Sequence, residues 1–176
     1  MLAVAAAQGI VVLVYRWVDQ GRKATTESTF RYERLPGKPA SDLVLLSLDG
    51  SSRKLADLRG KPILLHFWAT WCPPCKEELP GLLELGRELA RDGEFQVVAL
   101  TVDKDWDVVR EFFGGKIPPE VMRDGMGSAA DSYEVSTLPD TYLLATDGTL
   151  LLRFGGARNW RSSAARELLE DHIHGR

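Results

Sequence analysis

The stretch "KPILLHFWATWCPPCKEELP", residues 61–80, decides the fold. Its first half, residues 61–70, is a continuous apolar run with aromatic side chains, which is typical of a strand buried on both faces. Cys72 follows, then two prolines, then Cys75, and these are the only cysteines in the chain. A leucine-rich helical pattern begins directly after them. The cysteine pair is therefore predicted to lie between a buried strand and a helix.

Two cysteines at this spacing exclude several kinds of site. A disulfide framework requires several bridges, and a structural zinc site requires four ligands. The three histidines are His66, His172 and His174, and two of them lie near the C-terminus, so a complete Cys/His site is not expected. A bridge that closes so short a loop stabilises a fold only weakly. Redox chemistry is the better explanation, although an inert buried pair at a helix start is the plainer alternative.

The composition indicates one ordinary globular domain with some additional chain. The 176 residues are 44% hydrophobic, and 22 basic and 25 acidic residues give a formal net charge of −3. No basic run stands out, so no nucleic-acid partner is expected. We also expect no metal and no cofactor.

The N-terminal residues are predicted to form a membrane anchor over 1–18, because residues 2–15 are apolar with two interruptions. A signal-peptide core and an ordinary N-terminal helix are the alternatives. The basic residues that follow the apolar run favour a cytoplasmic domain by the positive-inside rule. Residues 19–42 are polar and aperiodic and are interpreted as a linker, so the folded domain is predicted over 43–176.

The remaining patterns predict an α/β fold with a central mixed β-sheet flanked by helices. In chain order they predict a β-hairpin over 42–58, a strand over 61–70, a helix over 75–93, a strand over 94–103, a short helix over 106–115, a short strand over 120–124, a short helix over 128–135, a hairpin over 140–156 and a final helix over 159–174.

The position of the cysteines suggests a division of labour between them. Proline is tolerated in the first helical turn, so Pro73 is expected to open the helix and Cys72 to lie at or just before its N-terminus. The helix dipole and the free N–H groups there favour a thiolate. Cys75 lies one turn further in. We therefore expect Cys72 to be the exposed nucleophile and Cys75 the sheltered resolving thiol.

At this point the sequence resembles a known family. "FWATWCPPC" is similar to the active site of the thioredoxin superfamily, and in particular to membrane-anchored TlpA/ResA/CcmG(DsbE)-like reductases. The segment "LPDTYLLATDG", residues 138–148, resembles the family segment that carries a cis-proline. Residues 42–69 resemble the added N-terminal β-hairpin of these reductases and its entry into the first core strand. The resemblance covers roughly residues 41–173 and implies a thioredoxin-like fold.

The resemblance also implies roles for individual residues. Pro139 would be the cis-proline beside the active site, and the preceding Leu138 would contact the substrate backbone. Trp71 and Pro73, which flank Cys72, are expected to contact the substrate as well.

Two further residues are candidates for proton transfer. Glu78 lies three residues after Cys75, on the same helical face, where relatives carry an acid that assists the thiols. The alternative interpretation is that Glu78 is a solvated surface glutamate like the adjacent Glu77. His66 stands where thioredoxins have a buried aspartate. It could shuttle a proton or, if charged, favour a thiolate, or it could be a hydrogen-bonded strand histidine without a catalytic role.

These observations predict a thiol–disulfide oxidoreductase that reduces protein disulfides outside the cytoplasm, with a role of the cytochrome c maturation type implied by the resemblance. The expected partners are protein disulfide or dithiol substrates, an upstream membrane electron donor, and the membrane through the N-terminal segment. The expected location is the periplasmic or extracytoplasmic side of the membrane, although the basic residues after the apolar run favour the cytoplasmic side. A disulfide-donating oxidase and a metal- or haem-chaperoning module that uses the dithiol remain alternatives.

Overall fold

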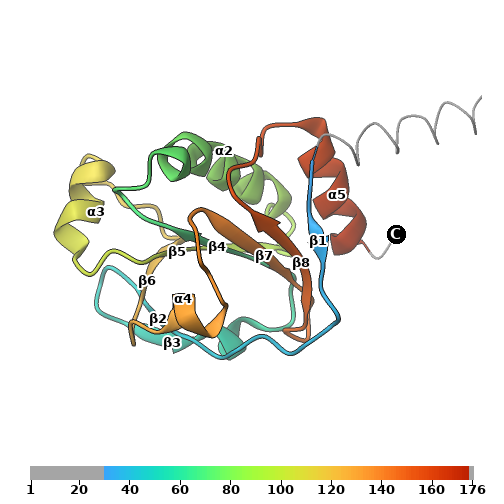
Figure 1. Cartoon of the computed structure of the whole chain (residues 1–176), viewed down its shortest axis with the longest axis horizontal. Helices are drawn as coiled ribbons and strands as arrows, with labels where there is room; N and C mark the ends of the chain where they lie inside the picture. Colours follow the sequence, from blue (N-terminus) through green and yellow to red (C-terminus); the bar gives the residue numbers. More distant parts are fainter. Residues whose placement is uncertain (1–29, 175–176) are drawn as a thin grey trace, which may run out of the picture. The chain divides into compact units, whose positions relative to one another are not determined.

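The core of the fold is an eight-stranded sheet, and the computed structural model describes it within residues 30–174. Figure 1 shows how the helices surround this sheet. The strands lie in the order β1 (Glu33–Arg34), β8 (Leu150–Gly155), β7 (Asp140–Leu144), β4 (Ile63–Trp68), β5 (Gln96–Thr101), β6 (Val121–Asp124), β2 (Val44–Leu46) and β3 (Ser52–Lys54).

The sheet is mixed, as the sequence predicted. β4 pairs with β5 and β5 with β6 in parallel, whereas the other neighbours are antiparallel. The predicted N-terminal hairpin is present as β2 and β3, and it joins the sheet through β6. A short 3₁₀ helix, η1 (Leu55–Leu58), follows the hairpin and leads into β4. All six residues of β4 are buried, in agreement with the continuous apolar run.

Four helices complete the described part of the chain: α2 (Pro73–Leu89), α3 (Trp106–Phe112), α4 (Ala129–Ser132) and α5 (Ser163–Ile173). In Figure 1, α2 and α5 lie on one side of the sheet and α4 lies on the other. The side chain of Arg161, which precedes α5, forms an ion pair with Glu84 of α2 at 2.9 Å. The thioredoxin-like fold is therefore confirmed in its sequence order and its layers.

Side chains of β4 alternate between two cores, because successive residues of a strand point to opposite faces. Leu65 and Phe67 belong to a cluster that also contains Tyr133, next to α4. The even-numbered residues of β4, including His66, lie on the other face. The neighbouring strand contacts α2 on this second face, where a Cβ at Gly86 would lie 2.2 Å from a methyl carbon of Val97. Gly86 thus permits the close approach of α2 to the sheet.

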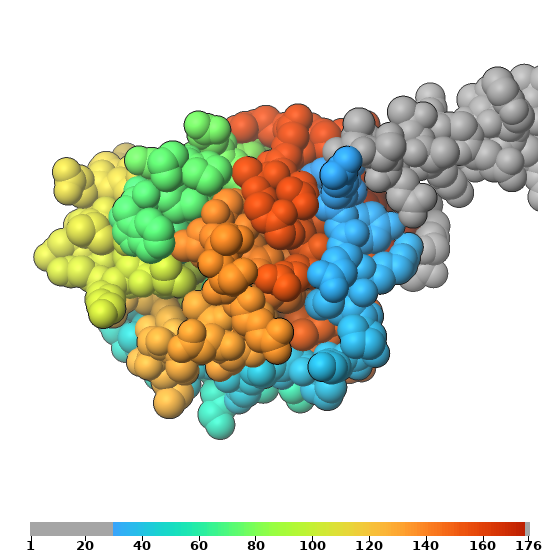
Figure 2. Space-filling model, viewed as in Figure 1, coloured from blue at the N-terminus to red at the C-terminus, as the bar shows by residue number. Residues whose placement is uncertain are grey.

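The boundary of the predicted linker is wrong. Residues 33–40, placed in the linker over 19–42, run along β8 instead, and β1 within them forms the edge of the sheet. The N–H of Leu35 donates to the carbonyl of Leu151 at 2.9 Å, and the N–H of Leu150 donates to the carbonyl of Lys38 at 2.9 Å. Figure 2 shows this segment in blue beside the orange and red C-terminal part of the sheet. The folded unit therefore begins well before Leu43.

The predicted anchor over residues 1–18 lies outside the described residues. Within residues 30–174, no helix has the length and the apolar character needed to cross a membrane.

Candidate active site

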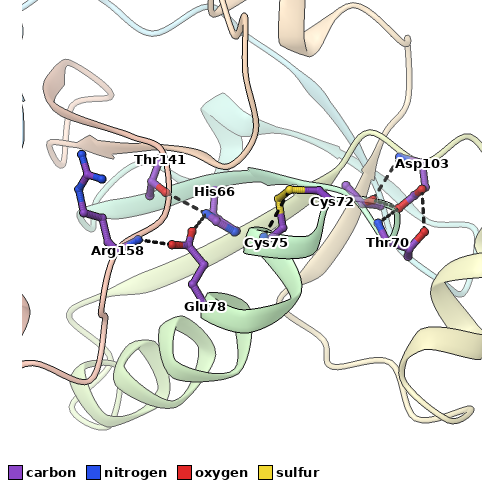
Figure 3. Close-up of a disulfide and its surroundings, with 9 residues drawn as sticks. His66, Thr70, Cys72, Cys75, Glu78, Asp103, Thr141 and Arg158 are labelled. Atoms are coloured by element: carbon purple, nitrogen blue, oxygen red, sulfur yellow. Dashed lines mark hydrogen bonds and ion pairs between the residues drawn. A yellow bond between two sulfur atoms is a disulfide. The ribbon is translucent and has the colours of Figure 1, made fainter.

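A disulfide joins Cys72 and Cys75 at the start of α2, with an S–S distance of 2.05 Å and a Cα–Cα distance of 5.3 Å. Cys72 is the N-cap residue, and its sulfur accepts a hydrogen bond from the backbone N–H of Cys75 at 3.3 Å. Pro73 occupies the first helical turn, where its missing N–H costs nothing. Figure 3 shows the bridge at the helix terminus. A thiolate at Cys72 would meet both an N–H donor and the positive end of the helix dipole.

The two sulfurs differ less in exposure than the sequence suggested. In the disulfide form Cys72 is 4% exposed and Cys75 is 0% exposed, and an exposed Cys72 nucleophile in the reduced form stays a prediction. The surface beside them is formed by Trp71, which is 66% exposed, and by the exposed Pro73. Both residues flank Cys72 and form the exposed surface next to the disulfide.

The peptide bond between Leu138 and Pro139 is cis, as the resemblance implied. β7 begins directly after it and runs antiparallel to β4, with Asp140 opposite Phe67. Pro139 therefore lies at the edge of the sheet where β4 ends and the segment with the cysteines begins. Pro139 is buried and Leu138 is half-buried.

Glu78 is a buried residue, 6% exposed, and not a solvated one. Its Oε2 accepts a hydrogen bond from the backbone N–H of Arg158, and its Oε1 lies 3.7 Å from Nδ1 of His66. Burial raises the pKa of Glu78 to about 7, although hydrogen bonds from Arg158 and from the Trp160 side chain and the charge of Arg158 act in the opposite sense. The carboxyl can therefore both take up and release a proton near neutral pH.

His66 is fully buried opposite Thr141, its partner in the pairing of β4 with β7. Its Nδ1 lies 2.8 Å from the Thr141 hydroxyl, within hydrogen-bonding distance. Burial lowers the pKa of His66 to about 3. The imidazole is therefore neutral at physiological pH, so the idea that a charged His66 favours a thiolate finds no support.

The sequence patterns did not indicate Asp103 as a residue of the site. It is 8% exposed and lies just after β5. Its carboxylate accepts the backbone N–H of Thr70 at 2.8 Å, the Thr70 hydroxyl at 3.0 Å and the Thr101 hydroxyl at 2.7 Å. This contact holds the segment that leads from β4 to Cys72. One available signal was the position of Asp103 after a buried strand parallel to β4, because such strands end at one edge of the sheet.

A second carboxylate fixes the strand that follows the cis-proline. Asp140 is 1% exposed and forms an ion pair with Arg153 of β8 at 2.7 Å. The guanidinium also donates to the backbone carbonyl of Glu134. The start of β7 is therefore tied both to β8 and to the preceding loop. Among the described residues, no cluster of three or more His, Cys, Asp or Glu side chains could hold a metal ion.

Comparisons with known proteins agree with this geometry. A family model described as the AhpC/TSA family matches residues 36–153. The thiol-disulfide oxidoreductase ResA of Bacillus anthracis is 34% identical over 140 residues, covering 78% of this chain and 76% of the relative. A crystal structure from Chlorobium tepidum, described as a thiol:disulfide interchange protein DsbE, superposes with a TM-score of 0.66 at 30% identity, covering 81% of this chain and 98% of that chain.

A further relative is the pneumococcal exposed lipoprotein thioredoxin Etrx1 from Streptococcus pneumoniae strain TIGR4. Its TM-score is 0.62 at 25% identity, and the match covers 74% of this chain and 99% of that chain. The fold, the disulfide at a helix N-terminus and these relatives together define a thiol–disulfide oxidoreductase. The chain belongs to the AhpC/TSA family, and its relatives there are of the ResA and DsbE kind.

Proposed function

We propose that this oxidoreductase reduces disulfides of partner proteins outside the cytoplasm. The observation that carries the proposal is the placement of its two sulfurs beside a buried carboxyl. Cys72 caps a helix, Cys75 lies one turn deeper, and Glu78, which can change its protonation near neutral pH, follows one turn later. These are the groups that two successive thiol–disulfide exchanges require.

In the first exchange the Cys72 thiolate attacks one sulfur of the partner disulfide. A mixed disulfide forms between Cys72 and the partner, and the other partner sulfur leaves as a thiolate that takes a proton from solvent. Trp71, Pro73 and Leu138 would contact the partner chain next to this bond. They are apolar, so partner recognition would depend on main-chain bonds and on shape more than on charge.

In the second exchange Cys75 releases the partner. Its thiol must first lose a proton, and a Glu78 carboxylate is the acceptor. The Cys75 thiolate then attacks the sulfur of Cys72, and the second partner sulfur leaves as a thiolate. The product is a reduced partner and the Cys72–Cys75 disulfide drawn in Figure 3. A membrane-bound dithiol donor would return the pair to the reduced form.

Trapping experiments test this function. In Cys75→Ser the mixed disulfide should persist on Cys72, and mass spectrometry of the trapped species identifies the partner. A role of the cytochrome c maturation type predicts partner peptides with the closely spaced cysteines of a haem attachment site. Cys72→Ser is the matched control, because it keeps one thiol but removes the attacking one. Equal trapping by both variants would contradict the assignment.

The direction of electron flow is tested in cells. A reductase should be found mainly with Cys72 and Cys75 reduced, and loss of its electron donor should shift it to the disulfide form. A protein that stays in the disulfide form while a donor is present would instead be an oxidase. Thiol alkylation before lysis, followed by a gel-shift assay, measures the two forms.

The extracytoplasmic location rests on the apolar residues 2–15 and on the relative described as an exposed lipoprotein. A reporter that is active only outside the cytoplasm, fused to the C-terminus, should be active. A reporter that is active only in the cytoplasm serves as the control. The reverse pattern would place the domain inside the cell and would rule out the proposed partners.

A further inference from the structure

One nitrogen of the active site has no hydrogen-bond partner among residues 30–174. It is Nε2 of His66, and the whole side chain is 0% exposed. The other ring nitrogen, Nδ1, lies 2.8 Å from the Thr141 hydroxyl and 3.7 Å from Oε1 of Glu78, a buried oxygen that also has no hydrogen-bond partner among the described residues. Buried polar atoms without a partner are rare in folded proteins, and each requires an explanation. We therefore expect Nε2 of His66 to bond to a group that is absent in the disulfide form.

The direction of this nitrogen suggests the missing partner. Cys75 and Glu78 are three residues apart on the buried face of α2, so their side chains lie one helical turn apart on that face. Figure 3 shows the imidazole of His66 between the carboxylate of Glu78 and the side chain of Cys75. Nδ1 is on the side of Glu78, and the unpartnered nitrogen is on the side of Cys75. A thiol can donate a hydrogen bond, whereas a disulfide sulfur has no proton to donate.

We propose that His66 relays the proton of the Cys75 thiol to Glu78 by exchanging its two neutral tautomers. The Cys75 S–H donates its proton to Nε2 while the Nδ1–H gives its proton to the Glu78 carboxylate. The products are a Cys75 thiolate, a neutral imidazole protonated on Nε2, and a protonated Glu78. The charge moves from the carboxylate to the sulfur, and no imidazolium forms. This inference rests on the proposed function and adds a residue to its second exchange.

The surroundings of His66 favour a neutral relay. Its ring faces Thr141 on β7, and Glu78 and Cys75 on α2. The only ionisable groups among these are the carboxyl and the thiol, while the backbone N–H of Arg158 reaches the far oxygen of Glu78. Burial lowers the pKa of the imidazole to about 3, so a relay through a charged ring would be costly at neutral pH. A tautomer exchange avoids that cost.

Glu78 also connects the proton relay to solvent. It lines a surface cleft of ≈ 340 Å³ together with Pro74, Glu77, Gly81 and residues 157–161. A proton that reaches Glu78 can therefore pass to water in this cleft, whereas Cys75 itself is fully buried. The imidazole of His66 connects the buried sulfur to the carboxyl at the cleft.

The test isolates the step in which Cys75 attacks. Reduced protein is loaded with one thionitrobenzoate group on Cys72, and the release of the chromophore by Cys75 is followed in a stopped-flow instrument. We expect His66→Gln to release it at least about tenfold more slowly than the wild type, because an amide cannot exchange protons between two nitrogens. Glu78→Gln should be slowed similarly. The double variant should be no slower than either single one, because the two residues act as one unit.

Thr141→Ser is the matched control for packing. It removes a buried methyl group beside the same imidazole but keeps the hydroxyl that lies 2.8 Å from Nδ1, so it should release the chromophore at close to the wild-type rate. A rate in Thr141→Ser as low as that in His66→Gln would mean that packing in the site matters and the imidazole proton does not. A wild-type rate in His66→Gln would also overturn the relay.

A measurement without any substitution complements the kinetics. In the reduced wild type at pH 8, nitrogen NMR should show His66 neutral, with its proton on Nδ1 and with Nε2 unprotonated. A proton on Nε2, or on both nitrogens, would overturn the proposal. If Cys75 releases nothing even in the wild type, the failure belongs to the proposed function. A wild-type protein that releases the chromophore, with an unaffected His66→Gln, refutes only the relay.

Discussion

The carboxylate of Asp103 accepts the backbone N–H of Thr70 at 2.8 Å and thereby fixes the chain two residues before Cys72. The same carboxylate also accepts the hydroxyl of Thr70 and that of Thr101. In all three hydrogen bonds a threonine supplies the hydrogen, and the carboxylate of Asp103 only accepts. The loop that presents Cys72 is therefore anchored to the end of the neighbouring strand β5.

Replacement of this acceptor should weaken both the fold and the exchange reaction. Asp103→Asn puts an NH₂ group where an acceptor is needed, so one buried donor faces another. We expect the free energy of unfolding to fall by about 1–3 kcal/mol. Exchange at Cys72 should also slow, since the preceding loop loses its anchor. Denaturant unfolding and the rate of a disulfide substrate measure the two effects.

Asp105→Asn is the control, because it makes the same change of charge two residues away. Asp105 caps α3 through the N–H of Asp107, and asparagine caps a helix about as well as aspartate does. This variant should keep both stability and rate. Equal losses in the two variants would show that charge in this region matters, and not the contact with Thr70.

Alkylation of the reduced protein should modify Cys72 before Cys75. Cys72 caps α2, next to the N–H of Cys75, so its thiolate is the better stabilised of the two. Cys75 has no exposed surface in the disulfide form. A limiting amount of iodoacetamide at pH 6–7, followed by peptide mass spectrometry, gives the order. Preferential labelling of Cys75 would reverse the roles of the two sulfurs.

Glu78 and His66 should make stability depend on pH in opposite senses. Burial raises the pKa of Glu78 from 4.5 to about 7, so the folded chain keeps a proton that the unfolded chain loses, and stability falls as pH rises across this range. Burial lowers the pKa of His66 from 6.5 to about 3, so the unfolded chain binds a proton first, and stability falls as pH drops across that range. Between pH 4.5 and pH 6.5 the effects of Glu78 and His66 on stability oppose each other.

Glu78→Gln separates the two effects. The wild type loses stability as pH rises through this range, because its buried carboxyl is forced to ionise, whereas the amide of the variant does not titrate. The free energy of unfolding of the variant, relative to that of the wild type, should therefore increase by about 2–3 kcal/mol as pH rises from 4.5 to above 7. Urea unfolding at a series of pH values measures this difference. Glu77→Gln, an exposed neighbour, should stay parallel to the wild type. A difference between Glu78→Gln and the wild type that does not change with pH would contradict the raised pKa.

The sequence predicted features that depend on local patterns. The order of strands and helices, the hairpin over 42–58 and the cap at Cys72 all follow from periodicity and from residues near each other in the chain. Glu78 and Glu77 illustrate the limit of such reasoning, since helical spacing indicated the correct face but could not show that Glu78 is buried. Burial depends on what packs over the helix, here the loop that contains Arg158, 80 positions later.

Contacts between distant residues could not be predicted. Asp103 contacts Thr70 from the end of the neighbouring strand, and its position after a buried strand indicated only the edge of the sheet and not this partner. The segment over 33–40 is polar and short, so it resembles a linker. It adopts an extended form only because β8 offers it an unpaired edge, and β8 begins more than 100 residues later. An edge strand of this kind has no sequence period of its own.

The segment along β8 leads to a final prediction about where the folded unit begins. A chain truncated to begin at Tyr32 should keep the pairing of β1 with β8, whereas one that begins at Leu43 loses the backbone hydrogen bonds of Leu35, Lys38 and Ala40. We expect the shorter chain to be less stable by about 2–3 kcal/mol, given about 1 kcal/mol for each bond.

Loss of the segment should also change solubility, because it leaves the edge of β8 free to pair with another chain. The shorter chain should therefore aggregate at concentrations where the longer one stays monomeric. Denaturant unfolding and light scattering of both chains measure the two effects. The chain that begins at Tyr32 controls for truncation itself, since both truncated chains lack the buried Phe30 and differ only in residues 32–42. Equal stability of the two truncated chains would mean that residues 32–42 contribute nothing to the fold and act as the linker that their composition indicates.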